Sequence, residues 1–180
     1  MGYFLAIDIP DFVAEELRAF SLPNDENIYH QRRADLHITL AYLGHIPDDK
    51  LDDFVDVLCD IEQESFSLSG AGVTYFGPGA RYRNHFYVAE IDLTSQLQNL
   101  KDQIDKAAMQ CDLTPKGHAD GFNPHITLAR SDQTISDADI QFFKGQNSEK
   151  KVPEFEVESF ALYKSQHPRP YKKLCEFGLK

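Results

Sequence analysis

The sequence predicts an α+β protein with mostly antiparallel sheets, built as two similar lobes. Patterns typical of strands and of helices alternate along its 180 residues, without the glycine-rich loop that marks a nucleotide-binding parallel sheet. In addition, the pentapeptide His-Ile-Thr-Leu-Ala occurs twice, at 37–41 and at 125–129. The offset of 88 residues is close to half the chain, which is too long for a solenoid repeat and indicates two units of similar build.

The first half of the chain alternates strand and helix patterns. A β-rich apolar run at 3–9 indicates a strand, and Pro10 then precedes a helix with apolar residues at helical spacing. Residues 36–43 form the strand that carries the first copy of the repeat. A second helix begins at Pro47, and early alternation within 65–75 indicates a further strand.

The second half continues this alternation after a turn at Gly77-Pro78-Gly79, which we interpret as a lobe junction. Ser95 and Gln98 have the spacing of a capping box at the start of an amphipathic helix. The other expected elements are a strand at 85–91, a loop at 114–121, a strand at 124–130 with the second repeat, a short helix at 136–143, a half-exposed strand around Phe155 and Val157, and a last strand near 171–179.

Composition and charge limit the classes of function. The 42% hydrophobic and 26% charged residues are ordinary for a globular protein, so we expect one domain over residues 1–180. The net charge of −11 argues against an extended grip on duplex phosphates. Residues 150–180 nevertheless hold seven Lys or Arg against four Glu. This excess is compatible with a locally positive site or with a solubilised surface that carries a few lysines.

The sequence also bears on location. No apolar run approaches the roughly 18–20 residues of a membrane span, and the first ten residues lack the basic start of a signal peptide. The three cysteines, Cys59, Cys111 and Cys175, form no CxxC pair, which argues against a disulfide framework and a structural zinc site. We therefore expect a cytoplasmic protein without membrane contact.

The repeated segment carries chemistry as well as structure. In a strand, alternate side chains share a face, so His37 and Thr39 lie on one side and Ile38 on the other. The imidazole and the hydroxyl are then about 7 Å apart. Two such strands supply one base and one acid near neutral pH, with two hydroxyls that can donate hydrogen bonds to a phosphodiester.

A purely structural role and a metal site are the alternatives to catalysis for the repeat. A single His-x-Thr in a strand is usually structural, but packing alone does not ask for the same polar pair twice. Two histidines and two hydroxyls fall short of a usual metal ligand set, and no HExxH motif occurs. The repeat therefore favours acid–base catalysis without a metal or another cofactor.

The segments LHITLAYLG and FNPHITLAR resemble the two HxTx motifs of the 2H phosphoesterase superfamily. Within it, the chain is most similar to the RNA 2′,3′-cyclic phosphodiesterases, also called 2′-5′ RNA ligases or LigT-like proteins. The resemblance extends to the FLAIDIP segment and to a late strand with Leu162, Tyr163 and Ser165. It implies a bilobal fold with pseudo-twofold symmetry, in which each lobe contributes one motif to a cleft between the lobes.

The resemblance also implies roles for individual residues. His125 would be the base that activates water, and His37 the acid that protonates the leaving ribose 3′-oxygen. Thr39 and Thr127 would orient the phosphate. Arg130 follows the second motif, as an Arg does in the family, and would steady the phosphate charge; the alternative is a surface ion pair with Asp132.

The remaining candidates have two interpretations each. Phe122 precedes the second motif and is either a platform for base stacking or a core residue. The segment with Tyr163, His167, Arg169 and Tyr171 either borders an RNA entrance or forms an exposed loop. We interpret the other histidines as structural or surface groups: His30, His45, His85, His118 and His167.

These interpretations lead to one expected activity. The protein would hydrolyse a 2′,3′-cyclic phosphate at an RNA end, or in a related small nucleotide, to a 2′-phosphomonoester, and would act as a monomer. Joining such an end to a 5′-hydroxyl through a 2′-5′ bond uses the same acid and base. A non-catalytic module that binds RNA ends is the third possibility, although binding alone does not need two proton carriers.

Overall fold

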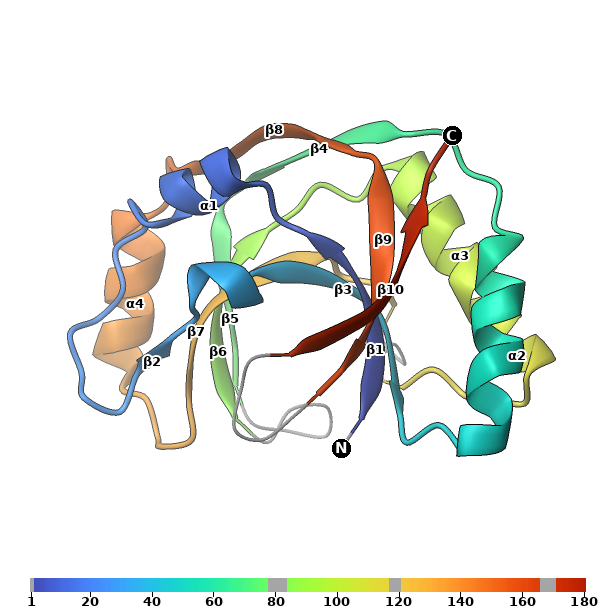
Figure 1. Ribbon diagram of the computed structural model, residues 1–180. Coiled ribbons are helices and arrows are strands. Elements are labelled where there is room, and N and C mark those ends of the chain that lie inside the picture. Colours follow the sequence, from blue (N-terminus) through green and yellow to red (C-terminus); the bar gives the residue numbers. More distant parts are fainter. Residues whose placement is uncertain (1, 78–83, 117–120, 166–170) are drawn as a thin grey trace.

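The structure is a computed structural model that describes residues 2–77, 84–116, 121–165 and 171–180 (Figure 1). The elements follow one another as β1 (Tyr3–Asp8), α1 (Asp11–Leu17), β2 (Tyr29–His30), the 3-10 turn η1 (Arg33–Asp35), β3 (His37–Gly44), α2 (Asp48–Cys59), β4 (Phe66–Ala71), β5 (Val73–Phe76), β6 (His85–Glu90), α3 (Ser95–Gln110), β7 (His125–Ser131), α4 (Asp137–Gln146), β8 (Lys151–Val157), β9 (Ser159–Lys164) and β10 (Lys172–Gly178). None of the described helices is long and apolar enough to cross a membrane.

One large antiparallel sheet organises the molecule. Its strands follow the order β10-β9-β1-β3-β7-β6-β5, with β2 paired to β7, and β4 and β8 form a separate ribbon. The two halves of the sheet meet where β3 and β7 pair through Ile38 and Ile126. The mixed α+β class with antiparallel sheets is therefore confirmed, and the two copies of the repeat are neighbouring strands.

The lobes of this sheet are not the halves of the sequence. The late strands β9 and β10 complete the half that contains β1 and β3. Helix α3 follows β6 in the chain but packs against β3 and α2. Figure 1 accordingly places α2 and α3 together on one side, with α1 and α4 toward the other.

Three local predictions were wrong. The proposed junction at residue 77 lies in the connection between β5 and β6, which pair with each other in the same half of the sheet; residues 78 and 79 lie outside the described ranges. The predicted strand at 65–75 is divided at Gly72, whose φ of 95° sends β4 and β5 into different sheets. Finally, Thr94 rather than Ser95 caps α3, because its hydroxyl accepts a hydrogen bond from the Leu97 amide at 3.2 Å.

The alternation predicted for the repeat is present in the core. Ile38, Leu40 and Ile126 are fully buried, and Leu128 is nearly so. Their aliphatic side chains belong to the main hydrophobic cluster of the protein. This burial fixes the register of β3 and β7, because a slip by one residue would expose the apolar side chains. The same constraint holds the polar side chains of the repeat on the opposite face.

Candidate active site

The two His-x-Thr segments meet at the centre of the large sheet. Ile38 faces Ile126 in the antiparallel pair, so His37 lies beside Thr127 and Thr39 lies beside His125. These polar side chains share one face and are half-buried. The structure thus brings together the four residues that the sequence predicted as a group, with each imidazole next to the hydroxyl from the other copy.

Both imidazoles are held by the backbone in the same way. The Nδ1 atom of His37 lies 2.7 Å from the carbonyl oxygen of Asp35, and Nδ1 of His125 lies 2.8 Å from that of Asn123. A carbonyl oxygen can only accept a hydrogen bond, so Nδ1 carries the hydrogen in both rings. In the neutral form of each ring, Nε2 is therefore the nitrogen without a hydrogen.

Arg130 reaches the same face through an irregularity in β7. In a regular strand, residues five positions apart point to opposite faces, so Arg130 would point away from His125. The pairing of β7 with β6 skips Leu128, which makes this leucine the extra residue of a β-bulge. The bulge restores Arg130 to the face that carries His125 and Thr127. Within the described part of the chain, no ion pair joins Arg130 to Asp132, although both line a cavity of about 100 Å³.

The first copy of the repeat contains the equivalent bulge. The pairing of β3 with β1 skips Leu40, and Tyr42 is consequently on the same face as His37 and Thr39. Tyr42 is 44% exposed and is the structural counterpart of Arg130. It was not predicted from the sequence, although extending the comparison by one residue, to HITLAY and HITLAR, would have found it.

Aromatic rings flank both histidines. The ring of His37 lies 5.2 Å from that of Phe4 and 5.5 Å from that of Tyr171. The ring of His125 lies 5.0 Å from that of Phe76. Tyr171 belongs to the segment whose alternatives were an RNA entrance or an exposed loop, and it lies beside His37. His167 and Arg169 of that segment are outside the described residues.

A carboxylate lies opposite each histidine on the outer neighbouring strand. Asp8 of β1 pairs with His37, and Glu90 of β6 pairs with His125. Asp8 accepts a short hydrogen bond from the Tyr163 hydroxyl, and Nζ of Lys173 lies 2.6 Å from its other oxygen. Besides the two histidines and two threonines, this region therefore contains two carboxylates, a phenol hydroxyl and an ammonium group.

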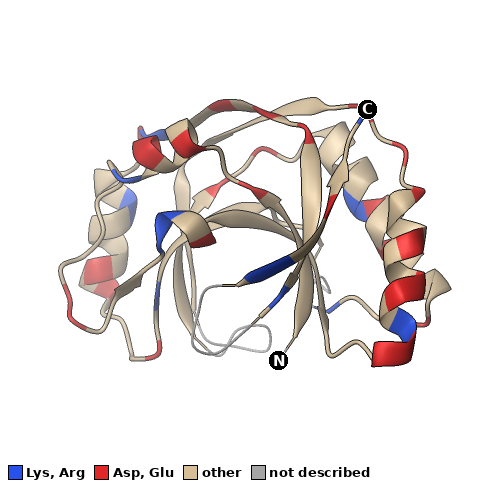
Figure 2. Ribbon diagram, in the orientation of Figure 1, with Lys and Arg blue, Asp and Glu red and all other residues tan. Residues whose placement is uncertain are grey.

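The environment of Tyr163 and Lys173 keeps both groups protonated. Burial raises the pKa of the Tyr163 phenol, and its hydrogen bond to Asp8 raises it further. Burial alone would lower the pKa of the Lys173 ammonium, but Asp8 and Glu176 outweigh it, and this pKa is raised. Figure 2 shows Lys or Arg on this part of β10, whereas Asp and Glu are prominent on α2 and α4.

Phe122 lies against α3. Its half-buried ring packs on the hydrophobic core, and the buried ammonium of Lys101 sits 5.8 Å from the ring centre. Among the described residues, the ring of Phe76 lies next to that of His125. These contacts favour the core interpretation of Phe122.

Among the described residues, no group of three or more His, Cys, Asp and Glu is arranged to hold a metal ion. His85 is a buried residue at the start of β6, and its Nδ1 atom shares a short hydrogen bond with the Tyr75 hydroxyl of β5. Burial lowers the pKa of this imidazole. Of the two interpretations, structural or surface, its burial favours the structural one.

Comparison with known proteins identifies the family. A family model described as the 2′-5′ RNA ligase superfamily matches residues 9–169. The chain belongs to the 2′-5′ RNA ligase superfamily. A curated relative, the RNA 2′,3′-cyclic phosphodiesterase of Methanocaldococcus jannaschii, is 24% identical over 174 residues, which cover 96% of this chain and 91% of the relative.

Solved structures show the same fold for this member of the 2′-5′ RNA ligase superfamily. A Thermus thermophilus protein matches with a TM-score of 0.78 at 22% identity, covering 99% of this chain and 98% of that one. E. coli LigT in complex with 3′-AMP matches with a TM-score of 0.74 at 23% identity, covering 99% and 97%. The LigT-like 2H phosphoesterase fold expected from the sequence is thus confirmed.

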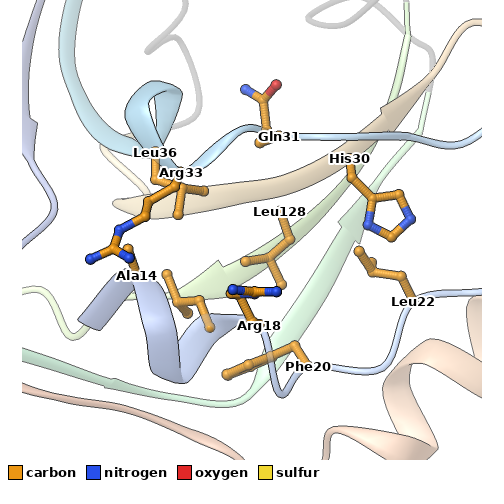
Figure 3. Close-up of a pocket in the computed structure, with 10 residues that line it drawn as sticks. Ala14, Arg18, Phe20, Leu22, His30, Gln31, Arg33, Leu36 and Leu128 are labelled. Carbon is orange, nitrogen blue, oxygen red and sulfur yellow. The ribbon is translucent and has the colours of Figure 1, made fainter. Parts of the chain in front are cut away.

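A separate cavity of about 380 Å³ lies between α1 and the segment leading into η1 (Figure 3). Leu128, the bulge residue of the second HxTx strand in this 2′-5′ RNA ligase superfamily member, contributes to its wall, but neither His37 nor His125 does. Arg18 and Arg33 line it as well, and both lie near the Glu15 carboxylate, at 3.4 and 3.6 Å. Arg33 also lies 2.9 Å from the Asp11 carboxylate, so each of the two cations has an acidic neighbour within the protein.

Proposed function

We propose that this protein opens 2′,3′-cyclic phosphates at RNA ends to 2′-phosphomonoesters, with two histidines as acid and base. The observation that carries the proposal is the matched anchoring of His37 and His125. Each Nδ1 atom donates to a backbone carbonyl two residues upstream, so Nε2 is the atom at which each ring would gain or lose a proton. Two equivalent hydroxyls lie between them, on Thr39 and Thr127.

The proposed reaction moves one proton through each histidine. Nε2 of His125 takes a proton from water as the water oxygen attacks phosphorus, and the bond from phosphorus to the ribose 3′-oxygen breaks. Nε2 of His37 gives its proton to that 3′-oxygen. His125 ends protonated and His37 neutral, so exchange with solvent restores the starting state.

Three residues would bind the phosphate in this mechanism. The hydroxyls of Thr39 and Thr127 would donate hydrogen bonds to the non-bridging oxygens, whose negative charge grows as water attacks. The Arg130 guanidinium, placed on the same face by the bulge at Leu128, would offset that charge. The proposal needs no metal, and residues 1–180 would act as one monomeric domain.

The known relatives support the substrate class. The Methanocaldococcus relative is named for cleavage of RNA 2′,3′-cyclic phosphates. E. coli LigT has been crystallised with 3′-AMP, NADP+ and ATP, all of which are nucleotides. The superfamily name also favours a test of the joining reaction, in which a 5′-hydroxyl takes the place of water and the same two histidines serve.

The test is incubation of a short RNA ending in a 2′,3′-cyclic phosphate with the protein in EDTA, followed by assignment of the phosphate on the product. We expect a 2′-phosphomonoester from the wild type, at least 100-fold less from His37→Ala or His125→Ala, and wild-type rates from the exposed control His45→Ala. A 3′-phosphate on the product would mean that the ribose 2′-oxygen leaves instead of the 3′-oxygen. No product, or product only after a divalent ion is restored, would contradict the proposal. A 2′-5′ linked product with added 5′-hydroxyl RNA would instead support ligation.

A further inference from the structure

The two histidines have matched backbone anchors but different charged neighbours. Asp8 and Glu90 occupy equivalent positions, opposite His37 and His125 on the outer strands. Asp8 is held by a tyrosine and a lysine, whereas no lysine or arginine of the described ranges pairs with Glu90. This difference separates the surroundings of the proposed acid from those of the proposed base.

Asp8 is placed to act on His37. Directly opposed residues of an antiparallel pair have Cβ atoms about 4.5–5.5 Å apart, and both side chains line the same small pocket, together with Tyr163 and Tyr171. At such a separation a carboxylate favours the protonated form of an imidazole. The anion is therefore close enough to influence whether His37 holds a proton to donate.

The orientation of Asp8 is fixed from the C-terminal hairpin. The Tyr163 hydroxyl occupies Oδ1 and the Lys173 ammonium occupies Oδ2. With a donor on each oxygen, the carboxylate is held in place and acts on His37 through its field. The Lys173 cation, which also lies 3.4 Å from Glu176, reduces that field without removing it.

We infer that Asp8, held by Tyr163 and Lys173, is a positioning residue that favours the protonated form of His37. This inference rests on the proposed function, in which His37 is the proton donor. Among the described residues, the titratable groups around His37 are Asp8 from β1, Asp35 from η1, His125 from β7, Tyr163 from β9 and Tyr171 before β10. Arg32 pairs with Asp35, Lys173 pairs with both Asp8 and Glu176, and Tyr42 lies further along the same face of β3.

The test is the pH dependence of kcat/KM on the cyclic-phosphate RNA for three variants. Asp8→Asn removes the anion, so the upper apparent pKa of the rate profile should fall by roughly half a unit to one unit. At alkaline pH this shift appears as a loss of about 3- to 10-fold. Lys173→Met removes the cation beside the Asp8 carboxylate, so the upper apparent pKa should rise. Lys180→Met removes a surface ion pair of 2.7 Å with Glu62 and should leave the profile unchanged.

A second substrate separates a positioning role from simple damage. Bis(p-nitrophenyl) phosphate has a leaving group that needs no acid, so Asp8→Asn should match the wild type on it. Equal losses on both substrates, an unmoved upper limb in Asp8→Asn, or shifts of the same sign in both variants would overturn the inference. An inactive wild type on the RNA would instead defeat the proposed function, so the two failures are distinguishable.

Discussion

Removing the hydroxyl of Thr127 should reduce catalytic activity strongly and change the stability of the fold little. Thr127→Val keeps the β-branched shape, which suits a strand. The Thr127 hydroxyl makes no hydrogen bond to another described residue, and the side chain is only half-buried. We therefore expect the free energy of unfolding to change by no more than about 0.5 kcal/mol.

The expected loss of activity is much larger. If the hydroxyl donates to a phosphoryl oxygen in the transition state, its removal should cost about 1.4–4 kcal/mol, or roughly 10- to 1000-fold in kcat/KM. Thr39 occupies the equivalent position beside His125, and Thr39→Val should behave alike. The assay is hydrolysis of the cyclic-phosphate RNA, run alongside thermal unfolding of each variant.

The sheet offers a matched control for this experiment. Thr74 of β5 lies opposite Val88, which in turn lies opposite Thr127, so Thr74 is two strands away, about 10 Å. Thr74→Val should keep wild-type activity. Activity within twofold of wild type in both Thr39→Val and Thr127→Val would refute a phosphate-binding role, as would a loss that Thr74→Val shares.

Three further predictions follow from the site and the core. The cleavage of an activated aryl phosphodiester should be retained by His37→Ala and lost by His125→Ala, because a good leaving group needs no acid; the reverse result would exchange their roles. Glu90→Gln should shift the acidic limb of the pH–rate profile to lower pH, because the proposed base His125 loses the anion opposite it. An acidic limb at the wild-type pH would contradict this. Asn147→Ala should lower the free energy of unfolding by about 2–4 kcal/mol, measured by chemical denaturation, because its buried amide makes three hydrogen bonds of 2.7–2.8 Å, two of them to Ser21; a change below 1 kcal/mol would count against it.

Local patterning predicted the centre of the site, and long-range contacts completed it. The alternation of apolar and polar residues placed His37 and Thr39 on one face because a strand has a period of two. The same rule alone would have turned Arg130 away, since the bulge at Leu128 depends on how β7 pairs with β6. The link from Asp8 to Lys173 joins residues at opposite ends of the chain, and no local pattern indicates it.

The misplaced cap of α3 has a local cause. Thr94 and Ser95 are adjacent and both have hydroxyls that suit an N-cap, and only the position of the first helical turn distinguishes them. Phe122 was similarly ambiguous, because an apolar residue before a strand fits the core or a ligand. Its contact with Lys101 of α3 and its packing on the core depend on the tertiary fold. The residues next to Phe122 in the sequence do not indicate either contact.

The position of β1 between β3 and β9 has a consequence for synthesis on the ribosome. This almost wholly buried strand is synthesised well before β9, so its pairing of Tyr3 with Lys164 must wait for β9. At about 5–20 residues per second, its backbone edge and apolar side chains remain without that partner for on the order of ten seconds or more. During this interval the nascent chain presents an open strand edge, so a chaperone that shields β1 should increase the yield of native protein.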